Sequence, residues 1–171
     1  MLRTHTCGEL NEKNIAKEVT ITGWVHSQRD HGDLIFIDLR DTYGITQIVF
    51  DPKKNKDLHI QAHQLKSEFV VKITGVVQKR PEGTENAKIG TGKIEILVTK
   101  LEILNPALTP PFEINDDALV SEETRLKYRY IDLRRAVMQK NLRLRYRITK
   151  IMRDYLSFNE ENVIKLILKI N

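Results

Sequence analysis

The 171-residue sequence lacks the features that mark secreted, membrane-spanning and metal-binding proteins. A single cysteine, Cys7, cannot form an internal disulfide, which is typical of a reducing compartment. The first ten residues contain no apolar run, so no secretory signal is expected. No stretch approaches the roughly 20 apolar residues of a membrane span. The five histidines form no metal-ligand pattern with Cys7. These absences predict a cytoplasmic protein without a membrane contact or a bound metal.

Motifs for nucleotide hydrolysis and acyl transfer are also absent. There is no Walker-type glycine loop and no Gly-x-Ser-x-Gly. The tetrapeptide 90–93 (GTGK) is too short for a phosphate loop and fits a turn that enters a strand. His59 and His63 are four residues apart, which fits a solvated helix face better than a two-ligand metal site. From residues alone, the chain is predicted to be a binding module without catalytic residues.

Positive charge is concentrated in one segment. Residues 121–153 contain 11 basic and 3 acidic residues, although the net charge of the whole chain is only +5. The remainder therefore carries −3 and has little general attraction for polyanions. Nucleic-acid binding by that remainder would depend on stacking and specific contacts, with phosphate attraction strongest at 121–153. A solvated helix face is the simpler reading of such a basic run.

Alternating apolar residues predict an all-β core before residue 105. The predicted strands are 19–25, 34–40, 45–50, 69–77 and 93–104, with a short amphipathic helix at 57–66 after the third strand. This order is that of a five-stranded OB-fold, a Greek-key barrel whose second and third strands face oligonucleotides. The Gly- and Pro-containing segment 79–92 is predicted to be a long, flexible connection.

The hairpin 34–50 carries the main candidate binding residues. Its core face is predicted to hold Ile35, Ile37 and Leu39. A turn at 41–44 pairs Arg40 with Ile45. Phe36 then lies opposite Val49 and is a diagonal neighbour of Gln47 on the outer face. A ring beside an amide can stack a base and read its edge. The alternative is that Phe36 lies under a covering helix.

After the strands, the sequence predicts a linker and then helices. Residues 105–120 contain three of the five prolines and form the predicted linker. Ser121 is a candidate cap for a following helix. A longer helix is predicted at 137–158, with an apolar stripe that requires a partner surface; it consists of Leu144, Ile148, Ile151 and Tyr155.

Two motifs in this order resemble one known family. The segment GWVHSQRDHGDLIFIDLRDTYGITQIVFDP (23–52) closely resembles the N-terminal anticodon-binding domain of bacterial-type aspartyl-tRNA synthetases. The segment RLKYRYIDLRR (125–135) resembles the hinge that joins this domain to a class II catalytic domain. Lysyl- and asparaginyl-tRNA synthetases share the architecture, but KYRYIDLRR is closer to the aspartyl enzymes. The resemblance covers residues 1–157 and implies an OB domain at 1–104, a hinge at 121–136 and the start of the catalytic domain at 137–171.

The resemblance also implies residue roles. Phe36 is expected to stack on the central anticodon base and Gln47 to hydrogen-bond it. Arg29, Arg80 and Glu95 are expected to be further anticodon contacts. The plainer alternatives are an exposed loop cation for Arg80 and a solvated strand residue for Glu95. The family often has three arginines where this chain has SQR (27–29), which predicts weaker contacts there.

Two positions bear on which tRNA is bound. Family members that charge both aspartate and asparagine tRNAs tend to carry a histidine after the Arg-Asp pair and a glycine in the loop between strands four and five. This chain has His31 and Gly83 at those positions. Each residue could also simply suit its turn.

The end of the sequence departs from the family. The first class II motif contains a proline that residues 157–171 lack, which resembles a truncation or a frameshift. We therefore expect no ligase activity and no bound ATP or Mg²⁺, which the full-length, homodimeric family uses. The expected partner is tRNA, and the helix after 137 is expected to cause self-association. The alternatives are a general single-strand-binding OB protein and an inert truncation product.

Overall fold

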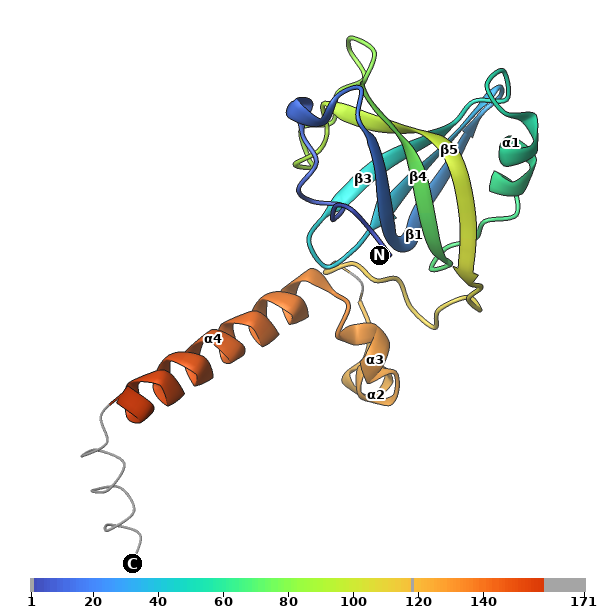
Figure 1. Cartoon of the computed structure of the whole chain (residues 1–171). Coiled ribbons are helices and arrows are strands. Elements are labelled where there is room, and N and C mark those ends of the chain that lie inside the picture. The colour runs from blue at the N-terminus through green and yellow to red at the C-terminus, as the bar shows by residue number, and fades with distance from the viewer. Residues whose placement is uncertain (1, 118, 159–171) are drawn as a thin grey trace, which may run out of the picture. The chain divides into compact units, whose positions relative to one another are not determined.

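The computed structural model describes residues 2–117 and 119–158. These described residues form two compact units, which divide between Pro110 and Pro111. The first unit contains a short 3-10 helix, η1 (Glu12–Asn14), five strands and one helix (Figure 1). The strands and helix are β1 (Glu18–His31), β2 (Leu34–Arg40), β3 (Ile45–Phe50), α1 (Lys56–Ala62), β4 (Val70–Lys79) and β5 (Ile94–Asn105).

The five strands close into a barrel in the order β1-β2-β3-β5-β4. All neighbouring strands are antiparallel except β3 and β5, which pair in parallel through Ile48 with Ile96 and Val49 with Leu97. The barrel is filled by alternate residues of each strand, as the pleat of a half-buried strand requires. The largest fully buried members include Ile21, Ile35, Ile37, Leu39, Ile48, Phe50, Ile73, Ile94 and Ile96. The predicted OB-fold is confirmed.

The predicted register of the β2–β3 hairpin is also confirmed. Arg40 pairs with Ile45, and Phe36 pairs with Val49. Asp41 closes the turn, because its Oδ1 accepts hydrogen bonds from the backbone N–H groups of Tyr43 and Gly44. The turn and the alternation together place the Phe36 ring on the outer face of the barrel.

Strand β1 continues to His31, beyond the predicted end at residue 25. A bulge interrupts the alternation of its side chains there, but the pairing with β2 continues. The pairing with β2 shifts between Val25 and Ser27, which leaves His26 as the extra residue. Before the bulge, Val19, Ile21 and Val25 are buried in the barrel. Before the bulge the odd-numbered residues point into the barrel, and after it they point outward. Arg29 therefore pairs with Phe36 and lies on the same outer face.

Helix α1 closes one end of the barrel. Asn55 caps it by accepting a hydrogen bond from the N–H of Leu58, and its buried residues are Leu58 and Ala62. The helix ends at Ala62, earlier than the predicted 66, and Leu65 reaches the core from the turn that follows. The β1–β2 turn lies beside α1 (Figure 1), with the Gln28 amide donating to the Ala62 carbonyl.

The second unit contains α2 (Glu122–Lys127), α3 (Arg129–Asp132) and α4 (Ala136–Phe158). Ser121 caps α2 as predicted, because its side chain accepts from the N–H of Thr124. The carboxylate of Asp132 is fully buried and forms ion pairs with three guanidinium groups, those of Arg125, Arg129 and Arg135.

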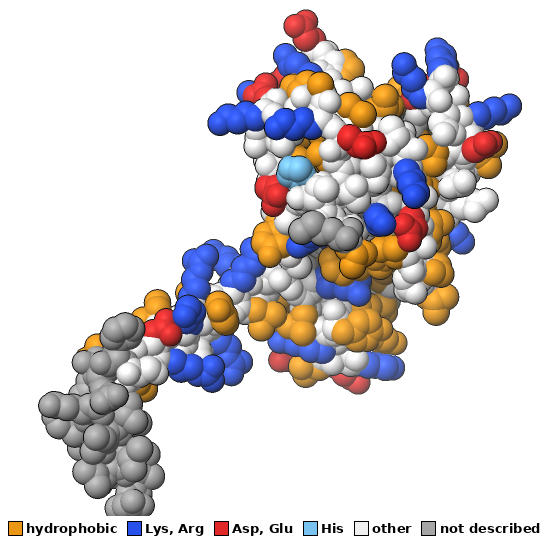
Figure 2. Space-filling model, in the orientation of Figure 1, with side chains coloured by type: hydrophobic (Ala, Val, Ile, Leu, Met, Phe, Trp, Pro, Cys, Tyr) orange, Lys and Arg blue, Asp and Glu red, His pale blue; other side chains and the backbone are white. Residues whose placement is uncertain are grey.

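Helix α4 carries basic side chains along its length, and Figure 2 shows them on the described part of this unit. The stripe of Leu144, Ile148, Ile151 and Tyr155 is exposed. None of the described helices is long and apolar enough to cross a membrane. The predicted continuation of the catalytic domain at 159–171 lies outside the described residues.

Candidate nucleic-acid interface

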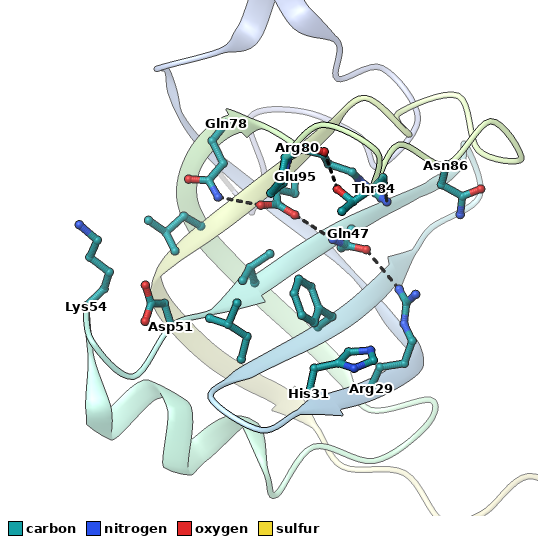
Figure 3. Close-up of a pocket in the computed structure, with 15 residues that line it drawn as sticks. Arg29, His31, Gln47, Asp51, Lys54, Gln78, Arg80, Thr84, Asn86 and Glu95 are labelled. Carbon is teal, nitrogen blue, oxygen red and sulfur yellow. Dashed lines mark hydrogen bonds between the residues drawn. The ribbon is translucent and has the colours of Figure 1, made fainter.

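A pocket of about 650 Å³ opens on the outer face of β2, β3 and β5 and beneath the β4–β5 loop (Figure 3). Its walls come from segments far apart in the sequence: Arg29, His31, Leu34, Phe36, Gln47, Val49, Asp51, Lys54, Gln78, Arg80, Pro81, Thr84, Asn86, Glu95 and Leu97. None of these belongs to α1, so the alternative that a helix covers Phe36 is wrong for the described chain. The barrel therefore brings Arg29, Phe36, Gln47, Arg80 and Glu95, all predicted site residues, into one pocket.

Apolar side chains form part of the pocket wall. Phe36 is half-buried, with Leu34, Val49 and Leu97 also lining the pocket. His31 meets the Phe36 ring edge-on, with 5.7 Å between ring centroids and an interplanar angle of 71°. The two rings therefore form a T-shaped pair, a geometry that aromatic pairs favour. A partly exposed ring in an apolar surround is suited to stacking against a planar ligand.

One side of the pocket is bounded by an ion pair between β1 and β2. The Arg29 Nη2 donates to both carboxylate oxygens of Asp38, at 2.9 and 3.0 Å. The Ser27 hydroxyl donates to the same carboxylate at 2.8 Å. Arg29 Nη2 also lies 3.2 Å from the Gln47 Oε1, to which it donates. This arrangement ties the guanidinium to both β2 and β3.

Glu95 continues the polar contacts on the opposite side of Gln47. The Gln47 Nε2 donates to Glu95 Oε2 at 2.8 Å, and the Gln78 Nε2 donates to Glu95 Oε1 at 2.7 Å (Figure 3). Glu95 is only 3% exposed, so its reading as a solvated strand residue is wrong. Glu95 is buried because Gln78, its partner across β4 and β5, covers the carboxylate with its side-chain amide.

Arg80 is buried as well, with 5% of its surface exposed, so it is not an ordinary exposed loop cation. Its Nε donates to the Ile94 carbonyl at 3.1 Å, and its Nη1 donates to the Thr84 carbonyl at 3.4 Å. Within the described residues, its Nη2 has no hydrogen-bond partner. Burial lowers the pKa of the guanidinium, while the carboxylate of Glu95 favours its charged form. Arg80 thus has a buried donor that lacks an acceptor among the described residues, which is a costly arrangement for a folded protein.

The two candidate discrimination residues occupy different environments. His31 lines the pocket, whereas Gly83 is absent from its described lining. Gly83 has a φ of +81°, a conformation that glycine adopts without the strain other residues incur. A requirement of the turn is therefore sufficient to explain Gly83. The influence of either residue on tRNA choice stays a prediction.

Sequence reasoning missed Ser27, Asp38 and Gln78. Strand alternation indicates that Asp38 lies on the outer face, two residues after Phe36, but its contacts depend on the β1 bulge that carries Ser27 and Arg29 there. Gln78 follows the alternation of β4, and only the β4–β5 register identifies Glu95 as its neighbour. Among the described residues, no group of three His, Cys, Asp or Glu side chains could hold a metal ion.

Comparison with known families agrees with this fold. Residues 19–104 match the family described as OB-fold nucleic acid binding domain. Residues 121–164 match the family described as tRNA synthetases class II (D, K and N). Among solved structures, the aspartyl tRNA synthetase from Entamoeba histolytica has a TM-score of 0.80 at 22% identity, covering 89% of this chain and 36% of that one. That likeness concerns the fold alone.

Curated relatives are more similar in sequence. The chain is 50% identical over 165 residues to an aspartate–tRNA(Asp/Asn) ligase of Legionella pneumophila strain Corby, covering 96% of this chain and 27% of that protein. It is 54% identical over 157 residues to a ligase of the same description from Halothermothrix orenii, covering 92% of this chain and 27% of that protein. The chain thus spans about a quarter of these relatives' length. It belongs to the aspartyl-tRNA synthetase family, of which it contains the OB-fold anticodon-binding domain and the beginning of the class II synthetase domain.

Proposed function

We propose that the barrel binds the anticodon loop of aspartate tRNA, and that of asparagine tRNA, within a protein that attaches aspartate to tRNA. The observation that carries this proposal is the partly exposed Phe36 ring in a pocket with the connected polar groups of Arg29, Gln47 and Glu95. Relatives at 50% and 54% identity are described as ligases for both tRNAs, which supports the wider tRNA range.

The chemistry of the pocket suits unpaired bases. An unstacked base can lie on Phe36 while its edge meets side chains that donate and accept hydrogen bonds. Gln47 has a second amide hydrogen and a second lone pair besides those used in the pocket. Arg80 lines the pocket, and a base carbonyl or a phosphate oxygen is the kind of acceptor that its buried Nη2 lacks. An anticodon loop presents both kinds of group at close spacing.

Phosphate attraction is expected to come mainly from the basic segment 121–153, because the rest of the chain carries a net negative charge. A fragment ending at Pro110 should therefore bind with a weaker dependence on salt than the full chain, since the slope follows the number of phosphates neutralised. Titrating a labelled anticodon stem-loop into both proteins at several salt concentrations measures the two slopes. Equal slopes would place the phosphate contacts within the barrel.

General single-strand binding is the second candidate, and the apolar part of the pocket favours it because stacking tolerates every base. Competition binding separates the two functions. The proposal requires aspartate and asparagine anticodon stem-loops to displace a bound aspartate stem-loop better than stem-loops whose loop bases are scrambled. Equal displacement by the scrambled loops would leave general single-strand binding as the function.

The ligase reaction itself is proposed for the whole protein. Family members use ATP and Mg²⁺ for this step, and the class II domain would supply that chemistry. We assign no described residue of this chain to ATP or Mg²⁺. The barrel's part in the proposal is to select the tRNA.

A further inference from the structure

The side-chain amide of Gln47 lies between two charges of opposite sign. Its Oε1 accepts from the Arg29 guanidinium at 3.2 Å, and its Nε2 donates to the Glu95 carboxylate at 2.8 Å. The reversed amide would point its N–H groups at a cation and its oxygen at an anion. Both contacts would then be repulsive, so the two charges select a single orientation of the amide.

Arg29 and Glu95 each have a further hydrogen-bond partner, Asp38 and Gln78 respectively. The anticodon resemblance assigns no role to either partner. Asp38 accepts two hydrogen bonds from Arg29, whose side chain is 46% exposed and would otherwise have several rotamers available. Gln78 donates to the Glu95 Oε1, the oxygen that Gln47 does not use. The contacts therefore run without a break from β2 through β1, β3 and β5 to β4, with Asp38 at one end and Gln78 at the other.

A fixed amide presents its acceptor and its donor in a set order. Across the pocket the groups are an Arg29 N–H donor, the Gln47 Oε1 acceptor, the Gln47 Nε2 donor and the Glu95 acceptor. The first three complement an acceptor–donor–acceptor edge, which uracil presents and cytosine does not. An amide free to reverse would also offer the opposite order and would discriminate less between base edges.

We propose that Asp38 and Gln78 are positioning residues that act through Arg29 and Glu95 to hold the Gln47 amide in one orientation, and thereby sharpen the choice of base. The inference rests on the proposed function, because it takes the pocket to read a base edge. Its structural part concerns only the state of the Gln47 amide, so that part is testable without RNA.

The first experiment measures the Gln47 side-chain amide by NMR in the full chain. In the unmodified protein, its two Nε2 hydrogens should have well-separated shifts and slow solvent exchange, because one is bonded to a carboxylate. Asp38→Asn and Gln78→Met should each bring the shifts together and accelerate exchange. Lys72→Met is the matched control, since it removes another β4–β5 side-chain contact, that of Lys72 with Glu102 at 3.1 Å, outside the pocket.

The second experiment measures binding of aspartate anticodon stem-loops with uridine or cytidine at the central position. Asp38→Asn and Gln78→Met should each reduce the preference for uridine by about fivefold or more. This is the lower end of the discrimination that one bidentate contact to a base provides. Lys72→Met should leave the preference unchanged. Because the two substitutions lie at opposite ends of the contacts, either one tests the proposal if the other folds poorly.

The outcomes separate this inference from the proposed function. If scrambled loops bind as well as the aspartate loop, the proposed function is wrong, while the NMR result still decides the orientation of Gln47. If the aspartate loop is preferred but both variants leave the amide signals and the uridine preference unchanged, the positioning role is overturned.

Discussion

Replacing Phe36 and Ile37 separately by alanine tests the assignment of the two faces of β2. The residues are neighbours in the chain, but Phe36 lines the pocket, whereas Ile37 is fully buried in the barrel. Loss of one base–aromatic stack weakens binding by about 1–3 kcal/mol, which is roughly a 5- to 150-fold rise in Kd. Truncating a buried isoleucine to alanine costs about 2–5 kcal/mol of folding stability.

The two variants should therefore separate binding from stability. Phe36→Ala should weaken binding of the aspartate anticodon stem-loop, measured by fluorescence anisotropy, with a smaller loss in urea denaturation than Ile37→Ala. Ile37→Ala should lose stability, while the protein that stays folded binds normally. Phe36→Tyr keeps the ring and serves as the control for stacking. A large fall in the stability of Phe36→Ala with unchanged binding would refute the reasoning and make Phe36 a core residue.

Four further predictions concern other parts of the chain. Glu68→Gln breaks a buried ion pair in which Arg40 Nη2 contacts the two carboxylate oxygens at 2.8 and 2.9 Å, so urea denaturation should show a loss of about 3–5 kcal/mol. Burial, with the nearby Asp41 carboxylate, raises the pKa of the Cys7 thiol far above its ordinary value of about 9. The folded state thus holds this proton more tightly than the unfolded state. The contribution of Cys7 to the free energy of unfolding should be complete below about pH 9 and decline above it. A thiol reagent should label Cys7 only on unfolding. His31→Leu with Gly83→Lys should favour the aspartate stem-loop over the asparagine one, with Gly83→Asn as a control for the φ of +81°; equal affinities would contradict the role of the pair. The exposed apolar stripe of α4 should make the full chain self-associate in sedimentation experiments while a fragment ending at Pro110 stays monomeric, and a monomeric full chain would disprove this.

Local rules were sufficient to predict the β2–β3 hairpin. Its register depends on a short turn closed by Asp41 and on the strict alternation of Ile35, Ile37 and Leu39. A shift of one residue would have moved these side chains out of the core, so only one register satisfies the pattern. The outer position of Phe36 followed directly.

The burial of Arg80 and Glu95 could not be predicted in the same way. Both are charged residues in or beside a loop, where solvent exposure is the usual outcome. Their environment is created by partners distant in sequence, including Gln47 and Gln78 for Glu95. The identity of these partners depends on how the barrel closes, which periodicity within single strands does not specify.

The bulge in β1 has a consequence for insertions and deletions. Val25 pairs with Leu39 and Ser27 pairs with Asp38, so the register on both sides is continuous if His26 is simply omitted. A chain lacking His26 should therefore keep Arg29 beside Phe36, although it would lose the 2.9 Å contact of His26 with Arg40. Thr22 instead lies within the regular ladder of β1 with β4. Deleting it would turn the inward side chains outward, and the outward ones inward, on one side of the deletion. His26 marks a point at which this strand can change length by one residue while the pocket keeps its residues.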